Sequence, residues 1–170
     1  INSSAASTSS DIQMTNIPSN YDVMKLFINI FVPVTNGAYP QIQFSDDNGA
    51  TYKSTGYDFG VSTVNDAGTA ADSGATSQSA SMIIGTASGV SNSATVGLQA
   101  EINIYNFGST GGKKFLVTNG CYWDGTNMKR FSSYCQYGSG APVVMNAIKI
   151  SCNSGNISTG KFYLYGLRNT

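Results

Sequence analysis

The residues best suited to chemistry form one short run, Ser45 to Tyr52, with the sequence SDDNGATY. Its pattern is Ser-x-Asp-x-Gly-x-Thr-aromatic. In such a turn the carboxylate of Asp47 accepts backbone N–H groups, Gly49 supplies a positive φ, and Tyr52 packs beneath the loop. The oxygens of this run could also ligate calcium, because hard cations prefer clustered carboxylate and amide oxygens. The run lacks the spaced ligands and the bidentate Glu of an EF-hand loop, so the pattern favours a structural turn.

The same run resembles the Asp-box hairpin, which is repeated in sialidase propellers and occurs singly in many other β proteins. A sialidase would repeat the box and would hold its substrate carboxylate with three arginines. This chain has one box, and its only arginines are Arg130 and Arg168. The resemblance therefore favours a structural hairpin over a sialidase site.

Acid–base residues are scarce in the chain. Histidine is absent, which removes the usual general base at neutral pH, the Ser-His-Asp and Cys-His arrangements, and most zinc or iron sites. Glu101 is the only glutamate, and a glycosidase would have to combine it with Asp47, Asp58 or Asp124. Nothing in their spacing places two carboxyl groups about 5 to 9 Å apart. We predict no catalytic residue, no cofactor and no metal site; the enzyme alternative is a glycoside hydrolase acting through Asp47.

Three cysteines, Cys121, Cys135 and Cys152, make an odd number without a close CxxC pair. This argues against a disulfide framework and against a zinc site, and it favours reduced, small apolar side chains. One alternative stays open. If the segment between Cys121 and Cys135 folds as a hairpin centred near Met128, these two thiols would face each other and form a single bridge.

The composition restricts the partners. Only 11% of the 170 residues are charged, and nine basic residues balance nine acidic ones, so no field exists to hold nucleic acid or an anionic membrane. No apolar run approaches the roughly 20 residues that a membrane-spanning helix requires. A chain of this length buries about 70% of its unfolded surface, enough for one core without metals or disulfides. We expect a soluble, single-domain protein.

Apolar and polar residues alternate along most of the chain, which predicts about ten strands and no helix. The segment Ala147–Leu167 contains two such runs and predicts a closing β-hairpin. The segment Asp22–Val32 is apolar on both faces, which predicts a central strand covered on two sides. Lys113–Trp123 and Met128–Tyr137 predict an aromatic-rich hairpin. The expected fold is an all-β antiparallel sandwich of jelly-roll type, with a closed barrel as the alternative.

Two segments have the composition of unstructured chain. Residues 1–10, INSSAASTSS, are polar and of low complexity, and we predict a flexible N-terminal arm that stays loose or orders against a neighbour. Residues 11–170 then form the single domain. Asn65–Ser79 has almost no large apolar residue and is the most loop-like internal segment.

Aromatic residues are numerous for a chain with so little charge. Strand propensity and packing account for most of them. We predict that a minority form a contact patch, either between subunits or for a sugar. The candidate interface or ligand residues are Ser3, Ser4, Tyr57, Phe59, Tyr122, Trp123, Phe131, Tyr134 and Tyr137.

Three features together resemble virion proteins of tailed bacteriophages, the tail-fibre-like or head-decoration modules. They are the run Tyr21–Tyr52, the small-residue linker after it, and the terminal run Ser151–Leu167, SCNSGNISTGKFYLYGL. The resemblance implies a β-sandwich that assembles as an oligomer, commonly a homotrimer, on the particle surface and catalyses no reaction. Cys152 departs from the small polar residue expected at its position.

The function expected from this resemblance is capsid decoration or cement. Such a protein stabilises the head through interfaces with its own copies and with other virion proteins such as the major capsid protein. It would be located at the virion surface after assembly in the host cytoplasm. The alternative is a tail-fibre or receptor-binding module that recognises a host surface glycan through Trp123 and neighbouring tyrosines, as a carbohydrate-binding module does.

Overall fold

The computed structural model of the chain describes residues 2–21, 23–84, 89–138 and 143–167, and Ile1, Asp22 and Arg168 lie outside them. In these ranges the chain forms strands and no helix, so the described part contains no helix that could cross a membrane. The strands are β1 (Asn2–Ser9), β2 (Asp11–Met14), β3 (Val23–Pro33), β4 (Pro40–Ser45), β5 (Tyr57–Asn65), β6 (Ala70–Ser79), β7 (Met82–Ile83), β8 (Leu98–Tyr105), β9 (Lys114–Trp123), β10 (Met128–Tyr137), β11 (Ala147–Cys152) and β12 (Ile157–Leu167).

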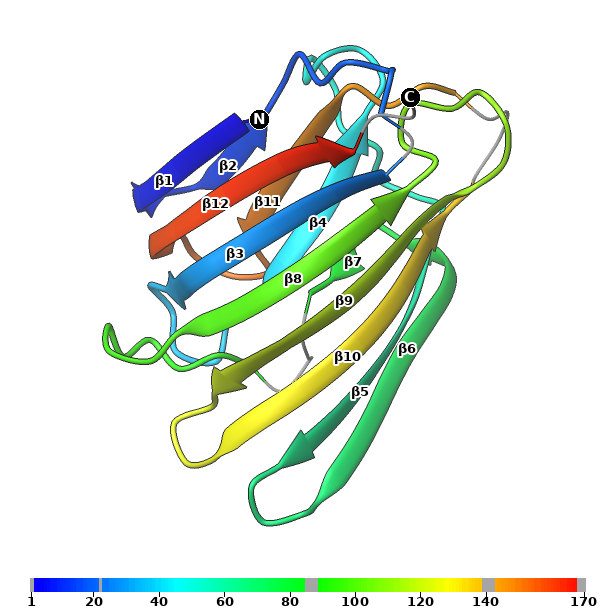
Figure 1. Cartoon of the computed structure of the whole chain (residues 1–170). Helices are drawn as coiled ribbons and strands as arrows, with labels where there is room; N and C mark the ends of the chain where they lie inside the picture. The colour runs from blue at the N-terminus through cyan, green and yellow to red at the C-terminus, as the bar shows by residue number, and fades with distance from the viewer. Residues whose placement is uncertain (1, 22, 85–88, 139–142, 168–170) are drawn as a thin grey trace.

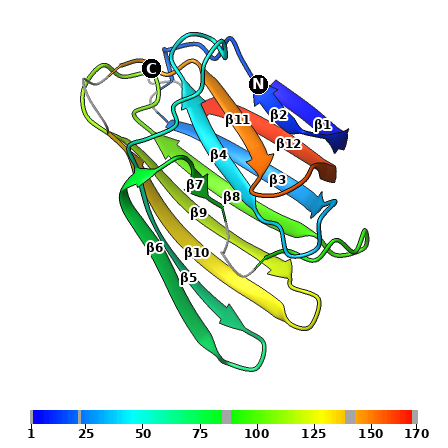
Figure 2. The same cartoon turned by 180° about the vertical axis from the view of Figure 1, so that it is seen from behind.

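The strands form two antiparallel sheets. The larger sheet has the order β1-β12-β3-β8-β9-β10-β5-β6, and the smaller one has the order β2-β11-β4-β7. The smaller sheet lies behind the larger one in Figure 1 and in front of it in Figure 2. The expected all-β sandwich is confirmed. The closed-barrel alternative is wrong, because β1 and β6 end the larger sheet without pairing with each other.

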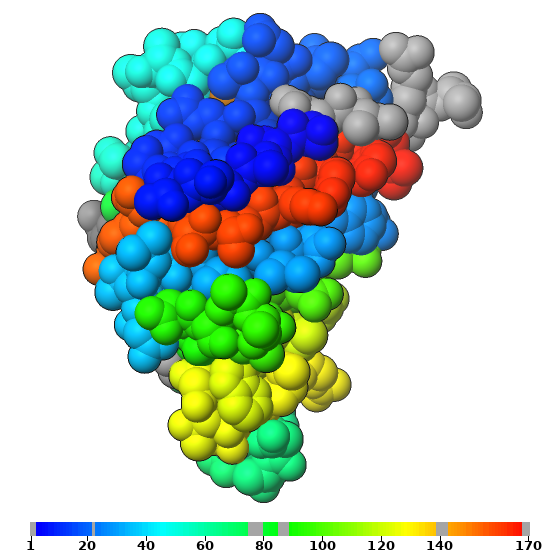
Figure 3. Space-filling view, turned by 90° about the vertical axis from the view of Figure 1, so that its left-hand side faces the viewer, coloured from blue at the N-terminus to red at the C-terminus, as the bar shows by residue number. Residues whose placement is uncertain are grey.

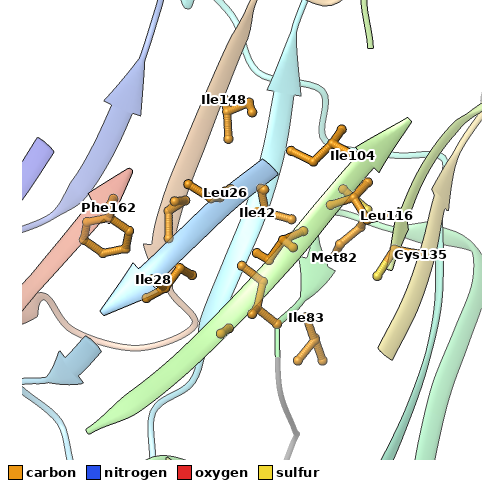
Figure 4. Close-up of a cluster of buried hydrophobic side chains, with 14 of the residues drawn as sticks. Leu26, Ile28, Ile42, Met82, Ile83, Ile104, Leu116, Cys135, Ile148 and Phe162 are labelled. Atoms are coloured by element: carbon orange, nitrogen blue, oxygen red, sulfur yellow. The ribbon is translucent and has the colours of Figure 1, made fainter. Parts of the chain in front are cut away.

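The core lies between the two sheets. Alternate residues of the larger sheet, among them Leu26 and Ile104, point at Ile42 and Ile148 of the smaller sheet, and all four are fully buried. Figure 4 shows these side chains meeting from both layers. The period of two in the sequence produces this arrangement, because successive strand residues point to opposite faces.

The larger sheet therefore has two different faces. We call the face that packs on the smaller sheet the covered face, and its opposite the open face. Strand β3 is central by pairing, between β12 and β8, but the prediction that both of its faces are covered is wrong. Lys25 and Phe27 are only half-buried on the open face, and Asn29 is exposed. No described element forms a layer over this side, so the apolar residues there face outward.

Both edges of the larger sheet correct a sequence expectation. Asn2–Ser9, predicted as a flexible arm, is the edge strand β1, paired with β12 of the same chain. Figure 3 shows it beside β12. Asn65–Ser79, predicted as a loop, contains the turn after β5 and the whole of the other edge strand, β6. Small polar residues suffice at an edge, because backbone hydrogen bonds to one neighbour hold the strand.

The expected closing hairpin is also corrected. Strand β11 pairs with β2 and β4 in the smaller sheet, whereas β12 pairs with β1 and β3 in the larger one. The turn at residues 153–156 therefore carries the chain from one sheet to the other. Each strand presents its apolar side to the same core, which is why alternation alone did not separate this arrangement from a hairpin.

A bulge interrupts β3 at Ile30. The pairing of β3 with β8 shifts between Ile28 and Phe31, and Ile30 has a φ of 55°, a conformation that is strained for a β-branched residue. Gly97 approaches the same point: a Cβ built on it would lie 2.7 Å from the carbonyl oxygen of Phe31. Only glycine allows the two backbones to come this close.

Candidate functional site

The Ser45–Tyr52 run forms the compact turn that its pattern predicts. The Oδ1 atom of Asp47 accepts hydrogen bonds from Ser45 Oγ at 2.6 Å and from the Thr51 backbone N–H at 2.9 Å, and Oδ2 accepts one from the Thr51 hydroxyl. Gly49 adopts a φ of 89° and donates its N–H to Ser45 Oγ at 2.9 Å. Tyr52, expected beneath the loop, places its ring under the ammonium of Lys149, 4.6 Å from Nζ.

These contacts occupy the oxygens of Asp47. The hydrogen bonds from Ser45 and Thr51 hold the pKa of its carboxyl group far below the ordinary value, because they stabilise the charged form. Its neighbour Asp46 forms an ion pair with Lys53 at 2.6 Å. Both carboxylates are thus engaged within the turn, and the arrangement supports a structural role for this loop.

Two further carboxylates, Asp124 and Glu101, are also engaged by neighbouring groups, and Asp58 accepts a hydrogen bond from Gln136 Nε2. Asp124 accepts the N–H groups of Thr126 and Asn127, each at 2.8 Å, in the β9–β10 turn, and pairs with Lys129 at 2.7 Å. Glu101 pairs with Lys25 at 2.5 Å on the open face, and hydrogen bonding to that lysine lowers its pKa. In the described ranges no three cysteines, aspartates or glutamates gather as a metal site.

The three cysteines are free. In the β9–β10 hairpin Cys121 is opposite Arg130 and Cys135 is opposite Leu116, so the two thiols lie at different heights and on opposite faces of the sheet. The bridge considered from the sequence is therefore excluded. Cys121 is exposed on the open face, whereas Cys135 is buried in the core.

The structure separates the nine candidate contact residues. Five aromatic side chains lie in the core and cannot form a surface patch: Tyr57, Phe59, Tyr122, Phe131 and Tyr137. Tyr134 is 71% exposed and Trp123 is half-buried. Ser3 and Ser4 belong to β1, where they pair with Tyr163 and Phe162. These five aromatic residues point inward, as Leu116 does, because alternate residues of a strand lie on the same face of the sheet.

One end of the open face carries exposed apolar side chains. They come from four strands and form what we call the apolar band: Tyr105, Phe115, Val117, Tyr134, Tyr165 and Leu167. Tyr105 is directly opposite Phe115, and Val117 is directly opposite Tyr134. The band is therefore continuous across β8, β9 and β10. An exposed apolar patch of this kind marks an interaction surface.

The Tyr134 ring owes its position to a glycine. Tyr134 is opposite Gly60 of β5, and a Cβ added at Gly60 would lie 2.6 Å from the tyrosine ring. The ring therefore lies over the glycine and remains mostly exposed. In the next strand Gly74 is opposite Gly60, so the sheet surface beside the ring is bare backbone.

Beside the apolar band the open face is hollowed, and both polar and aromatic side chains border the hollows. A hollow of about 780 Å³ is bordered by Phe27, Asn29, Gln99, Asn119, Arg130 and Tyr163. Asn119 and Arg130 also border a second hollow of about 340 Å³ that reaches Ser62 and Ser132. Those two serines border a third, of about 410 Å³, that reaches Asp72 and Tyr134. We call the three together the polar trough.

Several polar side chains of the trough have no bonding partner among the residues that the structure describes. Across the parts of the chain that the structure describes, the side chains of five lining residues make no hydrogen bond or ion pair: Asn29, Gln99, Asn119, Arg130 and Ser132. All five are exposed. Each therefore has its full bonding capacity available to a ligand or to water.

Sequence reasoning missed most of this face. Tyr134 was among the candidates, but Phe115, Val117 and Asn119 were not. A signal was present: β9 alternates Leu116 and Thr118 with Val117 and Asn119, so its second face changes from apolar to amide along the strand. The sequence prediction of an aromatic-rich hairpin did not divide the residues of this strand between its two faces, so the change was not used.

No protein-family model matches the chain, and no curated protein or solved structure matches it significantly. The similarity to phage virion proteins stays a prediction.

Proposed function

We propose that this protein is a non-enzymatic structural protein of a bacteriophage particle, most directly a capsid decoration or cement protein, which assembles through the apolar band. The apolar band is the observation that carries the proposal. Six exposed apolar side chains occupy one end of a sheet face that no described layer covers. Burying such a patch is favourable by about 25 cal/mol per Å² of apolar area.

The occupant proposed for the band is a second copy of the chain, in a closed ring of three. The chain has no net charge, so copies do not repel one another through long-range fields. The row Leu167, Val23, Tyr105 and Phe115, in which each residue is opposite the next, contains no charged side chain. Such rows suit the apolar centre of an interface between identical subunits.

The acid–base groups add support to a non-enzymatic function. Asp47 and Asp124 hold turns, and Glu101 is paired with Lys25. Each of these carboxylates is engaged by neighbours that it stabilises, and histidine is absent from the chain. The groups that a glycoside hydrolase would need are thus committed to local structure.

The test of assembly is the mass of the protein in solution, measured by light scattering after size-exclusion chromatography. The wild type should be a trimer. Val117→Lys should dissociate it, because the ammonium would be buried without a partner. Asn119→Lys is the matched control, two residues along the same strand on the same face, and should leave the trimer intact. A monomeric wild type at micromolar concentration contradicts the proposal.

The virion assignment needs its own test. Purified phage particles from a lysate of cells carrying the gene should contain the chain by mass spectrometry, and antibody labelling should place it on the capsid. Label at the tail fibres would favour the receptor-binding alternative. Absence from purified particles would remove the virion assignment while leaving self-assembly untouched.

A further inference from the structure

We propose that the polar trough binds an oligosaccharide chain and that a sugar carboxylate is held by Arg130. This inference goes beyond assembly and does not depend on it, because the bonding side chains of the trough lie outside the apolar band, with which the trough shares Tyr134 alone. The shape of the trough, the bonding groups along it and the aromatic rings at its ends support this proposal.

The shape suits an extended ligand. The three hollows adjoin through shared residues, Asn119 and Arg130 between the first two and Ser62 and Ser132 between the last two. They cross the sheet from β12 to β6, six strand intervals of about 4.8 Å each, or roughly 29 Å. A ligand that followed them would run across the strands and contact seven of them. That length accommodates several sugar rings in a row.

The bonding groups suit hydroxyls. Asn29, Gln99 and Asn119 are amides, and an amide presents a donor and an acceptor in one plane. Two adjacent sugar hydroxyls can use both. Ser132 adds a group that donates and accepts, and none of these side chains has a partner within the described parts of the chain. The trough can therefore exchange water for hydroxyl groups without breaking any internal hydrogen bond.

Aromatic rings flank the trough at both ends. Phe27 is directly opposite Tyr163 at the β12 side, and Tyr134 lies near the β6 side. The Phe27 ring is fixed by an edge contact with Tyr165, with ring centroids 5.9 Å apart and planes at 79°. Fixed aromatic faces bury the apolar side of a ligand at low entropic cost, and the phenol oxygen of tyrosine keeps a polar contact.

The charges exclude other elongated ligands. Among the residues that border the trough, the charged ones are Glu101, Arg130 and Asp72, and Glu101 is already paired with Lys25. A nucleic acid backbone needs several cations, and an extended peptide adds to a sheet at its edge rather than across its face. Arg130 is the one cation that borders the trough and has no partner among the described residues, and its planar guanidinium matches a carboxylate bidentately. Sugar chains that contain uronic acids should therefore bind more tightly than neutral ones.

The test is binding of the full chain to an array of neutral hexasaccharides, uronic-acid hexasaccharides and bacterial surface polysaccharides, followed by titration calorimetry with the array hits. We expect binding, tighter for the acidic member of a matched pair. Asn119→Ala and Arg130→Ala should each weaken it about tenfold or more. Asn20→Ala, an exposed amide outside the trough, is the control and should change nothing. Equal affinity for acidic and neutral partners would overturn the role given to Arg130.

The position of the ligand is tested with Cys121, which borders the largest of the three hollows of the trough. Bound hexasaccharide should slow the reaction of Cys121 with a maleimide and leave Cys152, in the smaller sheet, unaffected. The experiment works on monomer or trimer, so its result is independent of the assembly state. Absence of binding across the whole array, or binding that ignores both trough variants and leaves Cys121 unprotected, would overturn the proposal.

Discussion

The two faces of the eight-stranded sheet are formed by the same strands but have different roles. On β9, Leu116 and Thr118 are buried against the smaller sheet, whereas Val117 and Asn119, one residue further along each time, are exposed on the open face. The covered face fills the core, and the open face combines an apolar band with a polar trough. This contrast shows that alternation in the sequence indicates which residues share a face, whereas packing against the smaller sheet determines which face becomes the core.

The largest expected difference between the faces is thiol reactivity. Cys121 is exposed on the open face, and Cys135 lies on the covered face, where burial raises its pKa to about 12. At pH 8 about one Cys135 thiol in ten thousand is then the reactive thiolate. Maleimide should modify Cys121 at least about a thousandfold faster than Cys135 in the native protein, as measured by mass spectrometry of tryptic peptides.

The rate of a third thiol and the rates in denaturant provide two further checks of this prediction. Cys152, half-buried and with a pKa raised by burial to about 11, should react at an intermediate rate. In denaturant all three thiols should react at similar rates, because burial is removed. Native rates that are equal for Cys121 and Cys135 would contradict the assignment of the two faces.

The next contrast is stability. Leu116→Ala removes a side chain that is 1% exposed on the covered face, and we expect a loss of about 2 to 5 kcal/mol in the free energy of unfolding. Asn119→Ala shortens a side chain that is exposed on the open face outside the apolar band, and it should cost less than about 1 kcal/mol. Urea denaturation at fixed protein concentration measures both. Similar losses would mean that a second layer covers the open face in solution.

Much of the fold could be predicted from alternation, and the failures have a common cause. The strands β9 to β12 fall close to the predicted segments, because each carries a row of large apolar residues. Strands β1 and β6 were predicted as unstructured chain, because an edge strand of small polar residues depends on backbone hydrogen bonds that leave no mark in composition. The placement of β11 and β12 in different sheets likewise depends on tertiary packing, since both strands face the same core.

The candidate site was less predictable. The Asp47 turn followed from local spacing, because its hydrogen bonds join residues within a few positions of one another. The trough assembles Asn29, Gln99, Asn119 and Arg130 from four strands, so no local pattern contains it. Tyr122 and Tyr134 show the same limit. Both are tyrosines in strands, but Tyr122 lies on the covered face and in the core, whereas Tyr134 lies on the open face and at the surface.

The Asp47 turn lies outside both faces and provides a pH-dependent reference. The pKa of the Asp47 carboxyl group is lower in the folded than in the unfolded chain. On acidification the unfolded state therefore takes up the proton first. The stabilisation is complete above the ordinary aspartate pKa of about 4 and is lost as the pH falls through the folded value. Asp47→Asn should therefore lower the Tm at pH 7, although by less than Leu116→Ala does. The difference in Tm between the wild type and Asp47→Asn should shrink below about pH 4.

The matched control for the turn is Asp72→Asn. Asp72 is an exposed carboxylate on β6 with no partner in the described part of the chain. Its substitution should leave the dependence of Tm on pH close to that of the wild type. A deficit for Asp47→Asn that stays constant from pH 7 to pH 3 would show that the carboxylate charge does not stabilise the turn.

The smallest expected effect is a gain on the covered face. Ser133 is buried opposite Thr118, and its hydroxyl has no hydrogen-bond partner among the described residues. A buried unsatisfied hydroxyl costs free energy, so Ser133→Ala should raise the free energy of unfolding by about 1 kcal/mol. Ser132→Ala, its exposed neighbour on the open face, should stay within about 0.5 kcal/mol of the wild type. Destabilisation by Ser133→Ala would mean that the hydroxyl bonds to an ordered water between the sheets, so that even this covered face contains a polar contact.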